Sequence, residues 1–180
     1  MILEAAARVL ETHGLEGYNT NAIAERAGVS IGSVYQYFSN KDALTLALIA
    51  NFERELLEIV RTAIAATDGR DLRKSLRSII RALLEAHGRR ARLNRILETE
   101  EERLRQSAPD HSAAVELKAL IAALLTKHRT ELGTAVDAAV VDDVLVIVRA
   151  MVDATFRSEV APPAAERRIL RTVEGYLHWH

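Results

Sequence analysis

Two very short helical segments separated by a glycine restrict the folds open to this chain. Thr20 and Asn21 can cap a helix that reads AIAERA, and Gly28 ends it. A second helix, capped by Ser30, reaches about Phe38 although it is rich in glycine, hydroxyl groups and phenol rings. Two short helices joined by a tight glycine turn are typical of a helix-turn-helix.

The apolar residues of this segment have the spacing that such a corner needs. Ala24, Gly28 and Val34 stand four and six residues apart. We expect a small residue at Ala24, where the helices cross, and a positive φ at Gly28. Val34 then seats the second helix on the core, and the opposite face of that helix is left for a DNA major groove.

The outer face of the second helix carries hydrogen-bonding groups. Gln36 can pair with an adenine edge, and Gly32 allows close approach to the phosphate backbone. Lys41 offers an ammonium and a backbone N–H to a phosphate. The hydroxyl and amide groups come from Ser30, Ser33, Tyr35, Gln36 and Tyr37. Residues 1–45 hold three basic and five acidic residues, which predicts modest non-specific affinity.

The stretch NTNAIAERAGVSIGSVYQYFSNKDAL resembles the DNA-binding segment of the TetR family of bacterial transcriptional regulators. The resemblance covers about residues 2–48, roughly a quarter of the chain. The matching positions are Thr20, Ile23-Ala24, Ala27-Gly28-Val29-Ser30, Gly32, Tyr35, Tyr37-Phe38, Lys41 and Leu44.

The resemblance implies double-stranded DNA as a partner, bound as a palindromic operator by a homodimer. It implies that the chain is not an enzyme but a regulator, most simply a repressor released by a small apolar or amphipathic effector. The implied phosphate contacts are Thr20, Ser33, Tyr35, Tyr37 and Lys41. The implied base contacts are Ile31, Gly32 and Gln36.

Helical periodicity and helix-breaking residues continue to the end of the chain, with no convincing strand. The pattern predicts an all-α fold of about nine helices. We expect a helix-turn-helix DNA-binding domain over residues 1–45 and a helical ligand-binding and dimerisation domain over residues 46–180. The expected helices span 2–12, 22–27, 31–38, 40–67, 72–87, 90–103, 109–132, 138–158 and 164–176.

The composition excludes several classes of site. There are no cysteines, so disulfides and thiolate metal sites are absent. None of the six histidines forms an HExxH pair, and no nucleophile elbow or phosphate loop is present, so we expect no metal, cofactor or catalytic site. No apolar run approaches the roughly 20 residues of a membrane span and no signal peptide is visible, which predicts a cytoplasmic chain.

The last two expected helices have broad apolar faces, which suit a four-helix interface between two copies. The expected dimer contacts are Val144, Val148, Val152, Ile169, Val173, Tyr176 and Leu177. The middle helices are rich in Leu, Ile and Ala and would enclose the effector. The expected lining is Ile80, Leu84, His87, Ile96, Leu124, His128 and Met151. The alternative is a DNA-binding architectural or partner-binding protein without a small-molecule effector.

Overall fold

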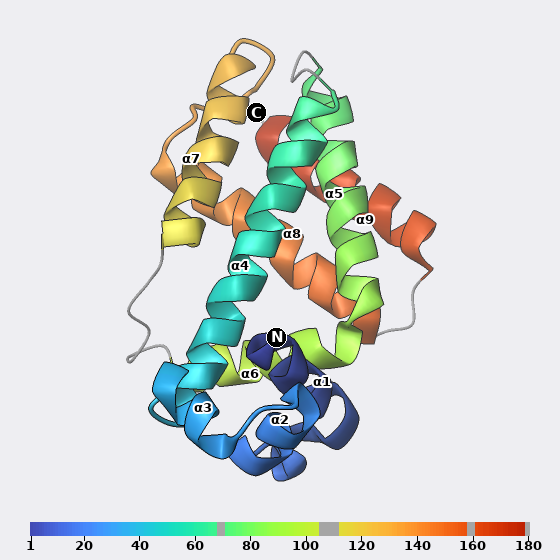
Figure 1. Cartoon of the computed structure of the whole chain (residues 1–180). Coiled ribbons are helices and arrows are strands. Elements are labelled where there is room, and N and C mark those ends of the chain that lie inside the picture. The colour runs from blue at the N-terminus through green and yellow to red at the C-terminus, as the bar shows by residue number, and fades with distance from the viewer. Residues whose placement is uncertain (68–70, 105–111, 158–160, 179–180) are drawn as a thin grey trace. The chain divides into compact units, whose positions relative to one another are not determined.

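The computed structural model describes residues 1–67, 71–104, 112–157 and 161–178, and every regular element in these ranges is an α-helix (Figure 1). The all-α prediction is therefore confirmed. The helices are α1 (Ile2–Gly17), α2 (Thr20–Ala27), α3 (Ile31–Tyr37), α4 (Lys41–Ala65), α5 (Leu72–Arg89), α6 (Ala91–Leu104), α7 (Ser112–Lys127), α8 (Ala138–Arg157) and α9 (Pro162–His178).

Asparagine side chains cap the starts of α2 and α4. Asn19, rather than Thr20 or Asn21, caps α2, because its side chain accepts a hydrogen bond from the Ala22 N–H at 3.0 Å. Asn40 caps α4 in the same way through the Ala43 N–H, at 2.8 Å. These polar caps fix where α2 and α4 start.

Three helix ends differ from the expected ones. Gly14 interrupts α1 with φ +64°, but a further turn continues to Gly17. Gly88 does not end α5, which runs on to Arg89. The helix α7 stops at Lys127 because the backbone tightens there, with the His128 N–H bonded to the Leu125 carbonyl three residues back. The expected start at Pro109 lies outside the described residues.

The chain divides into two compact units, which are described separately. Unit 1 comprises Met1–Arg54 and Arg90–His111. Its core joins α1, the start of α4, and Leu93 and Leu97 of α6. In Figure 1, α6 lies against α1 although the two are far apart in sequence. The expected boundary at residue 45 therefore differs from this division, because the leucines of α6 complete the core beneath the helix-turn-helix.

Unit 2 comprises Glu55–Arg89 and Ser112–His180. Its helix α9 packs on both α5 and α8, and α7 packs on α8. The core contains leucine, isoleucine and valine side chains from these four helices and from the last turns of α4. Among the described helices of both units, none is both long enough and apolar enough to cross a bilayer.

The expected dimer contacts require a correction. Five of them are buried within the single chain, so their side chains have no surface to present to a second copy. These five are Val144, Val152, Ile169, Val173 and Leu177. Val148 and Tyr176 are partly buried and pack against the same core. In the single chain, the apolar faces of α8 and α9 pack against α5 and against each other.

Candidate nucleic-acid interface

Gly28 forms the turn between α2 and α3 as the sequence predicts. Its φ of +67° and ψ of +31° are left-handed, a conformation that glycine adopts without strain. The Gly28 N–H bonds to the carbonyls of Ala24 and Glu25, and the Val29 N–H bonds to that of Ala24. Val34 is fully buried and fixes α3 to unit 1. The helix-turn-helix geometry is thus closed by backbone hydrogen bonds and one apolar anchor.

The opposite face of α3 is open to solvent. Ile31, Tyr35 and Tyr37 are 41%, 51% and 74% exposed, although large apolar side chains are usually covered. Gly32 and Gln36 are exposed beside them. A Cβ at Gly32 would find the nearest neighbouring atom, Oγ of Ser30, at 3.7 Å, so glycine is not required there by packing within the chain. The structure places the predicted base-contact residues together on this face.

Hydroxyl groups of the predicted phosphate contacts are held in pairs. The Thr20 Oγ1 and Tyr35 hydroxyl oxygens are 3.3 Å apart, which joins α2 to α3. Ser30 caps α3 by accepting from the Ser33 N–H at 3.1 Å, and the two serine Oγ atoms are 2.9 Å apart. Ser30 is thus an N-cap residue in addition to being a predicted DNA contact.

Lys41, a predicted phosphate contact, begins α4 beside a buried tyrosine. Its Nζ lies 5.9 Å from the ring centroid of Tyr18, within the range of a cation–π interaction. The hydroxyl oxygens of Tyr18 and Thr45 are 3.4 Å apart, and Thr45 also donates to the Lys41 carbonyl at 2.9 Å. Burial raises the pKa of Tyr18 to about 12. Tyr18 therefore contacts the first turns of α4 through Lys41 and Thr45.

Two arginines distant in sequence neutralise acidic residues near the helix-turn-helix of unit 1. Arg90 donates from Nε to Glu11 at 2.6 Å and from Nη1 to Glu4 at 3.3 Å. The hydrogen bond from Arg90 is the largest cause that lowers the pKa of Glu11. Arg90, which directly precedes α6, therefore offsets part of the excess negative charge of residues 1–45. Counting the charges of residues 1–45 alone does not reveal this.

Arg103, near the end of α6, makes the second such contact. Its Nη2 donates to Asp42 at 2.6 Å and to Glu100 at 2.7 Å. The hydrogen bond from Arg103 is the largest cause that lowers the pKa of Asp42, and Glu100 and then Asp42 raise the pKa of Arg103. Asp42 follows Lys41 directly, so this ion pair lies at the edge of the predicted DNA-contact surface.

The residues predicted to line an effector cavity do not form one group. Ile96 packs against the core of unit 1, whereas the other six belong to unit 2. Ile80, Leu84 and Leu124 lie in the core of unit 2, and Met151 packs against it. His128 is buried, with Nδ1 2.8 Å from Glu131 Oε1.

A groove of about 290 Å³ lies in unit 2 between α4 and α5. Ile59, Ala63 and Ala82 supply its apolar surface, and charged side chains stand at its rim. The complete lining is Glu58, Ile59, Thr62, Ala63, Ala82, Glu85 and Arg89. None of these residues was among the predicted lining, because a sequence pattern does not reveal where two helices diverge.

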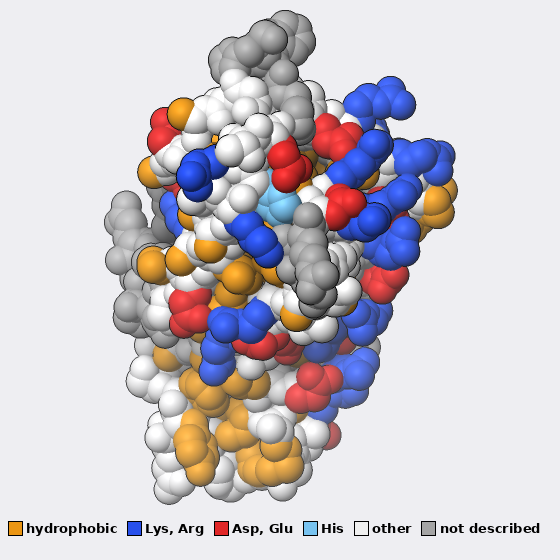
Figure 2. All heavy atoms as spheres, turned by 90° about the horizontal axis from the view of Figure 1, so that it is seen from above, with side chains coloured by type: hydrophobic (Ala, Val, Ile, Leu, Met, Phe, Trp, Pro, Cys, Tyr) orange, Lys and Arg blue, Asp and Glu red, His pale blue; other side chains and the backbone are white. Residues whose placement is uncertain are grey.

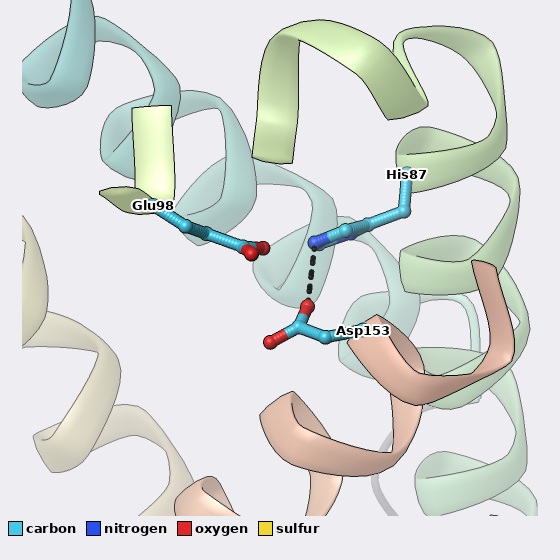
Figure 3. A group of neighbouring side chains, drawn as sticks. All are labelled: His87, Glu98 and Asp153. Carbon is cyan, nitrogen blue, oxygen red and sulfur yellow. Dashed lines mark ion pairs between the residues drawn. The ribbon is translucent and has the colours of Figure 1, made fainter. Parts of the chain in front are cut away.

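His87 forms a buried pair with Asp153 in unit 2 (Figure 3). The His87 Nε2 and Asp153 Oδ1 atoms are 3.5 Å apart, and the ring of His87 stacks on Phe156. Burial lowers the pKa of His87, an effect that the charge of Asp153 opposes. Glu98, also drawn in Figure 3, belongs to unit 1. Within unit 2 this pair provides two possible metal ligands, fewer than a protein metal site normally uses.

Three arginines of α5 are paired with acidic residues of α9. Arg77 and Arg81 donate to Glu166 of α9 at 2.7 and 3.0 Å, and Arg73 pairs with Glu174. On the face shown in Figure 2, Lys and Arg side chains likewise lie beside acidic ones. These three arginines are therefore neutralised within unit 2.

Comparisons with known proteins connect this geometry to a family. Residues 2–48 match the model of bacterial regulatory proteins of the tetR family. The transcriptional activator FasR of Mycolicibacterium smegmatis is 36% identical over 84 residues, which cover 47% of this chain and 37% of FasR. The transcriptional repressor AcnR of Corynebacterium diphtheriae is 37% identical over 59 residues, 33% of this chain and 31% of AcnR. The chain spans less than half the length of these curated relatives.

Solved structures match over nearly the whole chain. A TetR-family regulator from Streptomyces coelicolor is 26% identical, with a TM-score of 0.69, and the match covers 98% of this chain and 95% of that one. A putative TetR-family regulator from Mesorhizobium loti has a TM-score of 0.76 at 18% identity, covering 98% and 93%. Residues 2–48 therefore match the tetR family of bacterial regulatory proteins, and the chain has the fold of solved TetR-family regulators.

Proposed function

We propose that this chain is a homodimeric transcriptional repressor that binds a palindromic operator and is released from it by a small effector. The observation that carries the DNA-binding part is the exposed outer face of α3, which is fixed to unit 1 by the buried Val34. A rigid helix that presents glutamine, tyrosines and an isoleucine to solvent suits a major groove. Such a regulator acts in the cytoplasm, where it reaches DNA.

Selection from a random duplex library tests operator binding. We expect the wild type to enrich a near-palindromic sequence, because a two-fold dimer presents two equal α3 helices. Half-sites should be separated by about one helical turn or a multiple of it. If no sequence is enriched over the input library, the proposal of an operator-specific regulator is refuted.

For the dimer, we propose the exposed faces of α8 and α9 in place of their buried faces. Val146 is 65% exposed on α8, and Asp143 lies one turn before it. On α9, Arg168 and Arg171 are exposed at the corresponding spacing. Asp143 on α8 and the two arginines on α9 carry opposite charges, so two copies related by a two-fold axis can pair them.

Two valines allow a matched test of this surface. Val146→Asp should reduce the mass measured by light scattering to that of one chain, because the new carboxylate would be buried at the interface without a partner. Val115→Asp is the control, since Val115 is 64% exposed on α7. A dimeric mass for Val146→Asp, with an intact fold by circular dichroism, would contradict this interface.

The groove between α4 and α5 is the proposed effector site. Its volume is at the lower end of that of small-molecule pockets, and its apolar floor with a charged rim suits an amphipathic ligand. Binding would shift the population of conformations that hold DNA. The alternative function is an architectural DNA-binding protein without an effector. A small molecule changes the operator affinity of an effector-responsive repressor but not that of an architectural protein.

A ligand screen distinguishes these functions. We expect a compound that raises the melting temperature to weaken operator binding, and the operator to weaken compound binding by the same factor. Ala82→Trp should fill the groove and abolish the effect, whereas Ala119→Trp on the exposed surface of α7 should not. Operator affinity that no stabilising compound alters would favour the architectural alternative.

A further inference from the structure

Asp42 places a negative charge next to the lysine that we propose to contact phosphate. Lys41 and Asp42 are the first two residues of α4, and Lys41 is near enough to help lower the pKa of Asp42, after the larger contribution of Arg103. The Asp42 side chain is 48% exposed. Unless it is neutralised, a phosphate that approaches Lys41 meets a carboxylate as well, and the two anions repel each other.

Arg103 is held where it can neutralise this carboxylate. Besides the 2.6 Å contact with Asp42, its Nε and Nη2 atoms donate to Glu100 Oε2 at 3.1 and 2.7 Å. The Glu100 side chain is only 7% exposed, so it is a fixed anchor for the guanidinium. Arg103 is therefore oriented toward Asp42 by packing within unit 1 before any DNA arrives.

The four charged groups balance only when Arg103 is present. Lys41 and Arg103 are positive, and Asp42 and Glu100 are negative, so the loss of Arg103 leaves one net negative charge at the start of α4. We propose that Arg103 is a positioning residue for DNA binding, which occupies Asp42 and so leaves the ammonium of Lys41 available to a phosphate. This inference rests on the proposed DNA-binding function of unit 1.

The effect of Arg103 should appear in DNA affinity more than in stability. Its guanidinium and the Asp42 carboxylate are about half exposed, and exposed ion pairs contribute little to folding. An uncompensated charge beside a phosphate contact, in contrast, opposes every encounter with DNA. Because salt screens this repulsion, the loss of affinity should be largest at low ionic strength.

Four variants form the test: Arg103→Gln, Asp42→Asn, their combination, and Arg103→Lys. The measured quantity is the dissociation constant for one mixed-sequence duplex over a range of salt concentrations. Arg103→Gln should weaken binding roughly threefold to tenfold at low salt, with a smaller difference at high salt. The double variant should recover to within about twofold of the wild type, because the carboxylate is gone as well. Arg103→Lys should keep most of the affinity, since the charge remains.

Arg95→Gln is the matched control. Arg95 is an exposed arginine on the same helix, so its substitution removes an equal charge without exposing Asp42. Equal losses of DNA affinity in Arg95→Gln and Arg103→Gln would overturn the inference. It would also be overturned if Arg103→Gln weakened binding as much in the Asp42→Asn background as in the wild type.

Asp42→Asn alone tests the inference even if Arg103→Gln does not fold. It should leave duplex binding unchanged or tighten it slightly, and weaker binding by this folded variant would overturn the inference. Melting temperatures establish which variants are folded. If the wild type has no affinity for any duplex, the proposed function fails together with this inference. If the wild type binds and the effects of Arg103→Gln and Asp42→Asn on affinity are additive, the inference alone fails.

Discussion

The hydroxyl oxygens of Thr20 and Tyr35 lie 3.3 Å apart, so the first residue of α2 touches the exposed face of α3. Each hydroxyl is a predicted phosphate contact, and each can hold the other in place for a shared phosphate oxygen. Two hydroxyl groups that are oriented before binding lose less conformational freedom when DNA arrives. The pair therefore links the geometry of the helix-turn-helix to its proposed affinity for the DNA backbone.

Tyr35→Phe should weaken binding to all duplexes by a similar factor, because it removes a phosphate contact without changing base readout. Thr20→Val should do the same, and the double variant should lose less than the sum of the two, since the hydroxyls act together. Dissociation constants for the selected operator and for an unrelated duplex provide the measurement. If Tyr35→Phe alters the ratio of these two constants, Tyr35 reads bases and its proposed phosphate role is wrong.

Gln36→Ala should relax the base preference at one position of each half-site. Gln36 is exposed on the outer face of α3, and its amide can form paired hydrogen bonds with adenine. We expect a loss of about 1–3 kcal/mol for the preferred operator and a much smaller loss for operators changed at that position. A repeated library selection with the variant measures this. An unchanged consensus would show that Gln36 does not read a base.

The helix-turn-helix was predictable because its determinants are local. The small Ala24, the glycine turn at Gly28 and the apolar Val34 follow one another within a few residues, and each has the predicted burial or backbone conformation. The choice among adjacent polar residues is less certain, so the cap of α2 was misplaced by one position. Arg90 and Arg103 approach this region from distant segments, and no local pattern indicates which acidic residues they neutralise.

The broad apolar faces of α8 and α9 show a different limit. Periodicity indicates that one side of a helix is buried, but it does not distinguish burial against the same chain from burial against a second copy. Val173 fits either interpretation by its sequence position, and in the single chain it is completely buried. The groove between α4 and α5 was equally unpredictable, because it depends on how two helices are spaced.

Asn19→Ala should destabilise unit 1, because it removes the acceptor for the Ala22 N–H at the start of α2. The expected loss in the free energy of unfolding is about 1 kcal/mol. Asn21→Ala is the matched control, since Asn21 is exposed within the first turn and does not cap the helix. Urea unfolding of the two variants compares them. A larger loss of stability in Asn21→Ala would mean that Asn21 caps α2, as the sequence predicted.

Tyr18→Phe should remove a part of the alkaline sensitivity of the fold. The pKa of Tyr18 is raised from about 10 to about 12 by burial, so the hydroxyl stays protonated in the folded chain after it ionises in the unfolded chain. The wild type therefore loses stability as the pH rises from about 10 to 12, by about 2–3 kcal/mol from this group.

The difference in the free energy of unfolding between wild type and Tyr18→Phe, followed across this pH range, measures the contribution of Tyr18. Tyr37→Phe serves as the control, because Tyr37 is 74% exposed. If the wild type and Tyr18→Phe lose stability in parallel between pH 10 and 12, the hydroxyl of Tyr18 is already accessible to water in the folded chain.

Ile169→Ala should destabilise the single chain and leave its association unchanged. Ile169 is completely buried in the core of unit 2, where α9 packs on α5 and α8, so its truncation leaves a cavity. The expected loss is about 2–5 kcal/mol, as for other large-to-small changes in a core. Val115→Ala shortens an exposed side chain on α7 and should change the free energy of unfolding by less than about 0.5 kcal/mol. Melting temperature and light-scattering mass, measured together, separate the two roles. A monomeric mass for Ile169→Ala at an unchanged melting temperature would mean that this side chain faces a partner, as the sequence pattern first predicted.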